Sequence, residues 1–183
     1  MIIRCPDTYI AYVLVLEDGK LYVGITKEIA RRYLEHKSGA GAAFTHIHRP
    51  LGVVYYQETG TSWKPSAEAL KHEITVRLIS RYGVENVRGA DFCQINTERR
   101  NTRERVNYSW YSVKPPKNMH QIIDKNINGL LSGRLKADVD GSLINVTTNE
   151  GAFPSKTRKN NFKNKANFWW EKESSSGGRV IAI

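Results

Sequence analysis

The chain has 183 residues, of which 40% are hydrophobic, and a formal net charge of +10 at pH 7. This length predicts one domain with a sizeable core plus an extension, and no apolar run is long enough to cross a bilayer. The two cysteines, Cys5 and Cys93, are too few for a disulfide framework and lack the paired spacing of a zinc site. With no signal peptide evident, we expect an intracellular, cytoplasmic protein with reduced thiols and no membrane partner.

The positive charge is distributed unevenly along the chain. Residues 1–92 hold 12 Lys and Arg against 10 Asp and Glu, whereas residues 93–183 hold 16 against 8. A segregated basic excess predicts a polyanionic partner that binds mainly through the second half, although a basic surface that only contacts solvent would have the same composition.

The first elements in chain order are a hairpin and a helix. Residues 9–16 are typical of a buried strand, Asp18-Gly19 is a strong turn signal, and residues 21–25 form the return strand. Thr26 is a candidate cap for a helix whose apolar residues Ile29 and Tyr33 recur at helical spacing.

A third strand and a long helix follow. Val53–Glu58 is rich in β-branched and aromatic residues, which favour a strand. Ser66 is a candidate cap for a helix that runs to about Arg81 and stops near Gly83. These elements predict an α+β fold, a small three-stranded and mainly antiparallel sheet flanked by helices.

The second half gives weaker signals. Residues 97–106 are predicted to be a charged helix, residues 119–135 one or two short helices broken at Gly129 and Gly133, and residues 142–147 a strand. A basic, aromatic run over 156–170 and a Ser/Gly linker over 174–178 follow, so we expect a mixed, basic extension with a flexible tail.

Five blocks of the first half occur in an order that resembles the GIY-YIG nuclease family. Ile10-Ala11-Tyr12 stands where the family has Gly-Ile-Tyr, and Tyr22-Val23-Gly24 matches its second motif. An arginine follows ten residues after the second tyrosine, and a histidine follows four residues after that arginine. The last two blocks are Ser66–Glu73 and Tyr82–Gly89, so the resemblance covers roughly residues 9–92.

The resemblance implies a metal-dependent endonuclease that hydrolyses phosphodiester bonds in DNA. Residues 1–92 would be the catalytic domain and residues 93–183 the nucleic-acid-binding extension. The implied catalytic residues are Tyr12 as general base, Tyr22 assisting or orienting the water, Arg32 on the scissile phosphate, and His36 in a supporting role. Glu73 would be the ligand of Mg²⁺ or Mn²⁺, a hard cation that one carboxylate, water and substrate phosphate together suit.

Further basic and amide side chains are candidates for contacts to the DNA phosphates. These are Asn86, Arg99, Arg100, Arg103 and Lys159. The arginines between 97 and 106 are favoured because a helix would hold them rigidly. A homodimer is compatible with this function and is not specified by the sequence.

Strand parity gives a test of a shared tyrosine site. With a two-residue loop, Tyr12 and Tyr22 would point to opposite faces of the sheet, because side chains alternate along a strand. A loop of three or five residues, or a bulge, would put both on one face. The catalytic hypothesis therefore predicts an odd loop or a bulge.

Each site residue also has a purely structural interpretation. Arg32 could lie on the helix surface like Arg31, Glu73 could pair with Arg77 four residues later, and Asn86 could bond its own loop. The degenerate first motif keeps open a nucleic-acid-binding protein that has lost cleavage. An interaction protein whose basic face binds an acidic protein is a third possibility.

Overall fold

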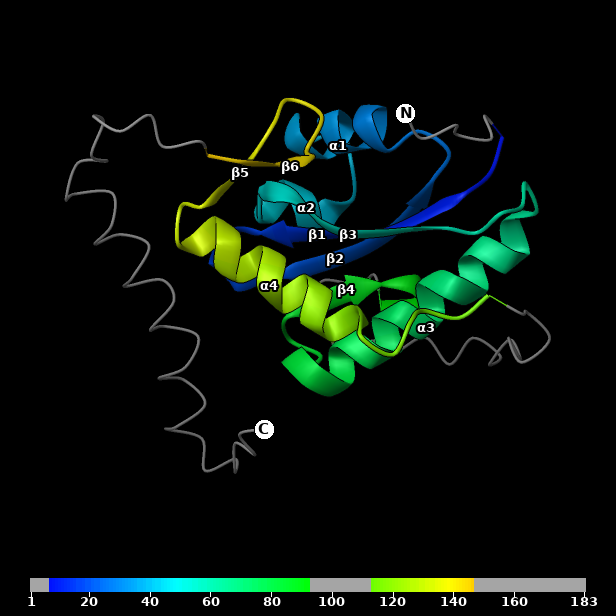
Figure 1. The fold of residues 1–183 in the computed structure, drawn as a ribbon. Coiled ribbons are helices and arrows are strands. Elements are labelled where there is room, and N and C mark those ends of the chain that lie inside the picture. Colours follow the sequence, from blue (N-terminus) through cyan, green and yellow to red (C-terminus); the bar gives the residue numbers. More distant parts are fainter. Residues whose placement is uncertain (1–6, 93–112, 147–183) are drawn as a thin grey trace.

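A single four-stranded sheet forms the centre of the molecule (Figure 1). The computed structural model describes residues 7–92 and 113–146. The strands are β1 (Ile10–Leu16), β2 (Leu21–Thr26), β3 (Pro50–Glu58) and β4 (Val87–Gly89), and their order in the sheet is β3-β1-β2-β4. β1 is antiparallel to both β2 and β3, whereas β4 is parallel to β2. The predicted α+β class is confirmed; β4 was missed because it has three residues and reaches β2 only through a crossover helix.

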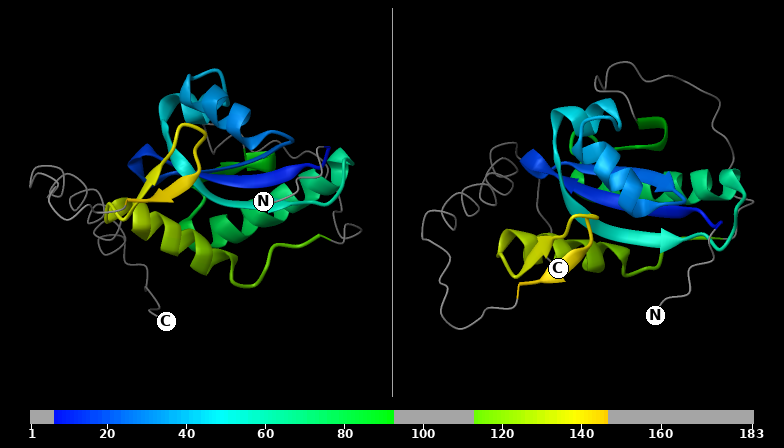
Figure 2. Two further views of the ribbon diagram at one scale, coloured as in Figure 1. Left: turned by 45° about the horizontal axis from the view of Figure 1, so that its top comes forward. Right: turned by 90° about the horizontal axis from the view of Figure 1, so that it is seen from above.

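Helices cover both faces of this sheet (Figures 1 and 2). One side carries α1 (Ile29–Lys37) and the short α2 (Ala43–Ile47), and the other carries α3 (Lys64–Tyr82) and α4 (Met119–Leu131). A small hairpin, β5 (Leu135–Ala137) and β6 (Leu143–Asn145), lies beside β3. None of the helices in the two described segments is long and apolar enough to cross a membrane.

The two-residue period of β1 and β2 divides the core into two layers. Odd-numbered residues such as Val13 and Val23 join Leu70 and Ile74 of α3, whereas even-numbered residues such as Tyr12 face α1 and α2. Every residue of β1 is buried because both faces are covered, which explains its continuous apolar sequence.

Both predicted helix caps are wrong. α1 begins at Ile29 after Glu28, and the Thr26 hydroxyl instead accepts a hydrogen bond from the Glu28 backbone N–H (3.0 Å). α3 begins at Lys64, before Ser66, with Pro65 in its first turn. Proline suits that position because its missing N–H would have no partner within the helix.

The described part of the extension belongs to the same core as the first half. Met119 and Ile123 of α4 are fully buried in the cluster around α3, and Asn126 Nδ2 donates to the Val54 carbonyl (2.7 Å). The predicted break at Gly129 is wrong, since α4 continues to Leu131. A side chain at Gly129 would collide with Leu135, so this glycine permits close packing of β5.

Part of the sequence prediction falls on residues that the structure does not describe. The predicted helix over 97–106 and the basic run over 156–170 are among them, together with the candidate DNA-contacting side chains Arg99, Arg100, Arg103 and Lys159. Those predictions stay as they were made.

Candidate functional site

The register of the first hairpin places both tyrosines on one face of the sheet. Tyr12 pairs with Gly24 and Leu14 pairs with Tyr22, across a loop of three residues, Glu17–Gly19. Asp18 and Gly19 both have positive φ. The predicted odd loop is confirmed, and the ring centroids of Tyr12 and Tyr22 lie 6.5 Å apart.

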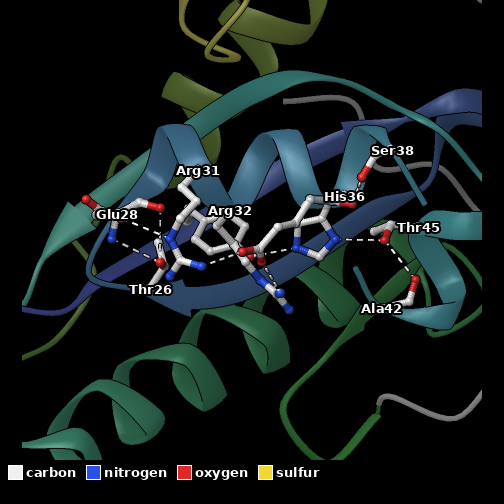
Figure 3. A network of polar contacts seen from close by, with 10 residues as sticks. Thr26, Glu28, Arg31, Arg32, His36, Ser38, Ala42 and Thr45 are labelled. Carbon is white, nitrogen blue, oxygen red and sulfur yellow. Dashed lines mark hydrogen bonds and ion pairs between the residues drawn. The ribbon is translucent and has the colours of Figure 1, made fainter. Parts of the chain in front are cut away.

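Arg32 and His36 both project from the first helix (Figure 3), and both contact the tyrosines. The centroid of the His36 ring lies 6.1 Å from that of the Tyr12 ring and 4.9 Å from that of the Tyr22 ring, and Arg32 hydrogen-bonds Tyr12. The two residues are four apart and so share a face of α1. The His36 side chain is completely buried, and the Tyr12 hydroxyl lies 2.8 Å from its Nε2. An Arg32 guanidinium nitrogen donates to Glu35 Oε2 (2.7 Å), whereas Arg31 is 65% exposed and pairs with Glu28 and Glu35. Arg32 is thus the less exposed of the two arginines, at 31%, and its phosphate-binding role stays a prediction.

Thr45, from α2, contacts the far side of the His36 ring. Its Oγ1 lies 2.7 Å from His36 Nδ1 and donates a hydrogen bond to the Ala42 carbonyl oxygen (2.8 Å), as Figure 3 shows. Thr45 is not among the site residues predicted from the sequence. Helical spacing relates residues of one helix only, and Thr45 reaches His36 across a turn between two helices.

A pocket of about 340 Å³ opens beside Tyr12 and Tyr22 at the edge of β2. It is lined by Tyr9, Tyr12, Tyr22, Val23, Gly24, Ile25, Arg32, Lys64, Glu68 and Lys71. The three cations of this set come from α1 and α3 and outnumber its one carboxylate, Glu68, which forms an ion pair with Lys71 one turn later. The pocket is therefore electrostatically suited to an anion.

Glu73 and Asn86 do not line this pocket. Glu73 Oε1 accepts from Arg77 Nε (2.9 Å), and its side chain is 43% exposed. It lies five residues after Glu68, about 140° farther around a helix of 3.6 residues per turn. The side chain of Asn86 accepts from Lys20 Nζ (2.8 Å) and donates to the Tyr82 carbonyl (2.8 Å). These contacts match the structural interpretations, in which Glu73 pairs with Arg77 and Asn86 bonds its own loop. The roles of Glu73 as metal ligand and of Asn86 as a phosphate contact stay predictions.

Burial sets the protonation states of Tyr12 and His36. It raises the pKa of Tyr12 well above the usual value, Tyr22 raises it further, and the nearby Arg32 guanidinium opposes both. Burial also lowers the pKa of His36 to about 4, with help from the positive charge of Arg32 and against the opposing effect of Glu35. At neutral pH a protonated Tyr12 therefore faces a neutral imidazole.

The pocket fits a metal ion that is held by one protein carboxylate. Among residues 7–92 and 113–146, no three His, Cys, Asp or Glu side chains gather into a cluster that could hold an ion by themselves. Glu68 alone supplies a carboxylate to the pocket lining. One carboxylate suits Mg²⁺, which keeps several waters and takes its remaining ligands from substrate phosphates.

Comparison with known proteins finds one matching family model and several relatives. A family model described as the GIY-YIG catalytic domain matches residues 8–74. UPF0213 proteins of Staphylococcus epidermidis, Staphylococcus saprophyticus and Staphylococcus aureus are 39%, 37% and 32% identical to this chain over 75 residues, which is 41% of this chain and 87% of each relative. No solved structure matches.

The match to the catalytic-domain model and the fold around it define a domain with a nuclease fold. The chain belongs to the GIY-YIG family, and the resemblance seen in its motifs is confirmed. The family model ends at residue 74, so β4, α4 and the β5–β6 hairpin lie beyond it. The family implies a nucleic-acid substrate.

Proposed function

We propose that this protein is a metal-dependent endonuclease that hydrolyses phosphodiester bonds in DNA. The observation that carries the proposal is the convergence of Tyr12, Tyr22 and Arg32 on one pocket whose cations outnumber its carboxylate. Lys64 and Lys71 add to the attraction that such a pocket exerts on a phosphodiester backbone.

Arg32 is the group that binds the scissile phosphate. Its side chain is 31% exposed, so the guanidinium can reach substrate, and Glu35 holds it in one orientation. A guanidinium stays charged at any working pH and donates two parallel hydrogen bonds to phosphate oxygens, which stabilises the negative charge that develops during attack.

Tyr12 accepts the proton of the attacking water. A full tyrosinate is disfavoured because burial raises the pKa of Tyr12, so the oxygen takes the water proton as its own proton passes to His36 Nε2, 2.8 Å away. The water oxygen bonds to phosphorus, the bond to the leaving oxygen breaks, and that oxygen takes a proton from solvent. Tyr22 borders the same pocket and orients the water.

Glu68 is the residue that would hold the metal ion, in place of Glu73. A bound Mg²⁺ would neutralise charge on the phosphate and the leaving oxygen. Glu68 lines the pocket beside Arg32 and Tyr22, whereas Glu73 pairs with Arg77. In this structure Glu68 forms an ion pair with Lys71, which a cation bound to the carboxylate would replace.

The degenerate first motif does not remove a pocket group. Ile10 and Ala11 are buried in β1, and neither lines the pocket. Their change from the family's Gly-Ile leaves Tyr12 in contact with His36. The substitution that suggested a non-catalytic binding protein therefore gives no structural support to that alternative.

Cleavage of supercoiled plasmid and of duplex and single-stranded oligonucleotides tests the proposal. We expect nicking or linearisation with Mg²⁺ and none with EDTA. Glu68→Gln should reduce the rate at least about 100-fold, and Glu73→Gln, the matched control on the same helix, should stay within about twofold. Intact DNA of every form, unmodified and methylated, with both Mg²⁺ and Mn²⁺ would overturn the proposal. Loss of activity in Glu73→Gln alone would return the metal-ligand role to Glu73.

A further inference from the structure

A continuous chain of buried hydrogen bonds extends behind Tyr12, away from the pocket. The Tyr12 hydroxyl contacts His36 Nε2 (2.8 Å), His36 Nδ1 contacts Thr45 Oγ1 (2.7 Å), and Thr45 Oγ1 contacts the Ala42 carbonyl oxygen (2.8 Å). The His36 side chain is completely buried, and Thr45 is 1% exposed. Figure 3 shows the chain running from α1 into α2.

The direction of this chain follows from the number of protons available. Thr45 has one hydroxyl proton, and a carbonyl oxygen can only accept. If that proton pointed at His36, two oxygens would face each other at 2.8 Å with no proton between them. The proton therefore lies between Thr45 and Ala42, the Thr45 oxygen accepts at His36, and Nδ1 of the neutral ring carries the hydrogen.

We infer that Thr45 is a positioning residue, which fixes His36 as the Nδ1–H tautomer so that its Nε2 can only accept the Tyr12 proton. The tautomer of His36 also sets the direction in which the Tyr12 O–H points. With its O–H engaged by His36, the Tyr12 oxygen accepts from the Arg32 guanidinium through one lone pair and presents the other to the pocket, where a water proton would be taken. In the opposite tautomer His36 would donate to Tyr12 and occupy that remaining lone pair.

The surroundings of the His36 ring leave no room for another group to replace the Thr45 hydroxyl as the partner of Nδ1. A Cβ added at Gly41 would lie 2.2 Å from His36 Nδ1, so the backbone of the α1–α2 turn closes over that edge of the ring. Together with the complete burial of His36, this closure excludes a water molecule that could replace the hydroxyl. Removing the hydroxyl should leave Nδ1 with no partner.

Nuclear magnetic resonance of the imidazole nitrogens tests the inference directly. In the ¹⁵N-labelled full chain at pH 7, long-range proton–nitrogen correlations should show a protonated Nδ1 for His36, with His36→Gln used to assign the signals. Thr45→Ser should preserve the pattern, and Thr45→Val, which keeps the side-chain shape, should shift the ring toward the Nε2–H form. A wild-type Nε2–H tautomer would overturn the inference even if Thr45→Val failed to fold. So would a Thr45→Val ring that keeps the wild-type pattern.

Cleavage kinetics give a second readout, which rests on the proposed endonuclease function. Thr45→Val should lower kcat at least about tenfold with KM within about twofold, and Thr45→Ser should recover activity to within about threefold of wild type. Equal cleavage by wild type and Thr45→Val would overturn the positioning role. If wild type cleaves nothing but shows the expected tautomers, the proposed function fails and the assignment of the tautomer to Thr45 stands.

Discussion

The ring of Tyr12 lies directly against the backbone of Gly24, its partner on the neighbouring strand. A Cβ built at Gly24 would be 2.3 Å from the Tyr12 hydroxyl oxygen and 2.4 Å from the carbon that bears it. The glycine of the Tyr22-Val23-Gly24 motif is thus required by the tyrosine of the preceding motif, because any side chain there would displace the ring from the pocket.

Gly24→Ala should therefore impair both stability and activity. Moving a packed ring costs about 1–3 kcal/mol of unfolding free energy, and the displaced Tyr12 hydroxyl would lose His36, so we expect at least about a tenfold loss of cleavage. Urea unfolding and plasmid cleavage measure the two effects. Gly133→Ala is the control: its φ of 73° makes alanine strained, but nothing lies within 4 Å. It should be destabilised with cleavage unchanged, and a similar loss of cleavage in both variants would contradict the argument.

The neighbours Arg31 and Arg32 should differ sharply in their contribution to cleavage. Arg32 lines the pocket, whereas Arg31 is exposed and pairs with Glu28 and Glu35. Arg32→Lys keeps the charge but loses the two parallel donors, so single-turnover cleavage should fall at least about tenfold. Arg31→Lys should stay within about twofold of wild type. Equal effects of the two substitutions would show that neither guanidinium contacts the scissile phosphate.

Stability should fall as the pH is lowered from about 6.5 to about 4, in part because of His36. Its pKa is about 4 in the folded protein and near 6.5 when unfolded, so within this window the unfolded chain binds the extra proton. The stabilising contribution is complete above pH 6.5 and is lost as the pH falls through 4, by roughly 3 kcal/mol in total. Protonation would also put a hydrogen on Nε2, which could then no longer accept from Tyr12.

Urea unfolding at pH 7.5, 6.0, 5.0 and 4.0 would measure this dependence. The pKa of His120 is lowered as well, so the comparison that isolates His36 is wild type against His36→Gln. The variant should show a shallower loss of stability over the same range. Parallel curves would place the pH dependence on other groups.

Asp124 of α4 should contribute to stability without contributing to cleavage. It accepts hydrogen bonds from the Tyr82 hydroxyl and from Arg81 Nη2 (2.5 Å), and so ties α4 to the end of α3. Asp124→Ala leaves a half-buried tyrosine hydroxyl without this acceptor, which we expect to cost about 1–3 kcal/mol. Glu85→Ala, at an exposed position, should change unfolding free energy by less than about 0.5 kcal/mol. A cleavage defect in Asp124→Ala at a temperature where it is fully folded would show that α4 acts on the site.

The parts of the site that the sequence could predict are those set by local geometry. The step of four residues from Arg32 to His36 places both on one face of any helix, and strand alternation linked the shared tyrosine face to an odd loop. That Glu68 lines the pocket could not be predicted, because the sequence alone gave no reference for the rotation of α3 about its axis. Thr45 was missed because its partner lies on another helix.

The sequence by itself determined the α+β class, the β1–β2 hairpin and the order of the motifs, because period, turn chemistry and spacing act between near neighbours in the chain. Only the tertiary structure decided which carboxylate lines the pocket. The burial of Leu70, Ile74 and Leu78 against the sheet sets the rotation of α3, and that rotation carries Glu68 to the pocket and leaves Glu73 beside Arg77. Such packing depends on contacts between residues far apart in the chain, which no local pattern encodes.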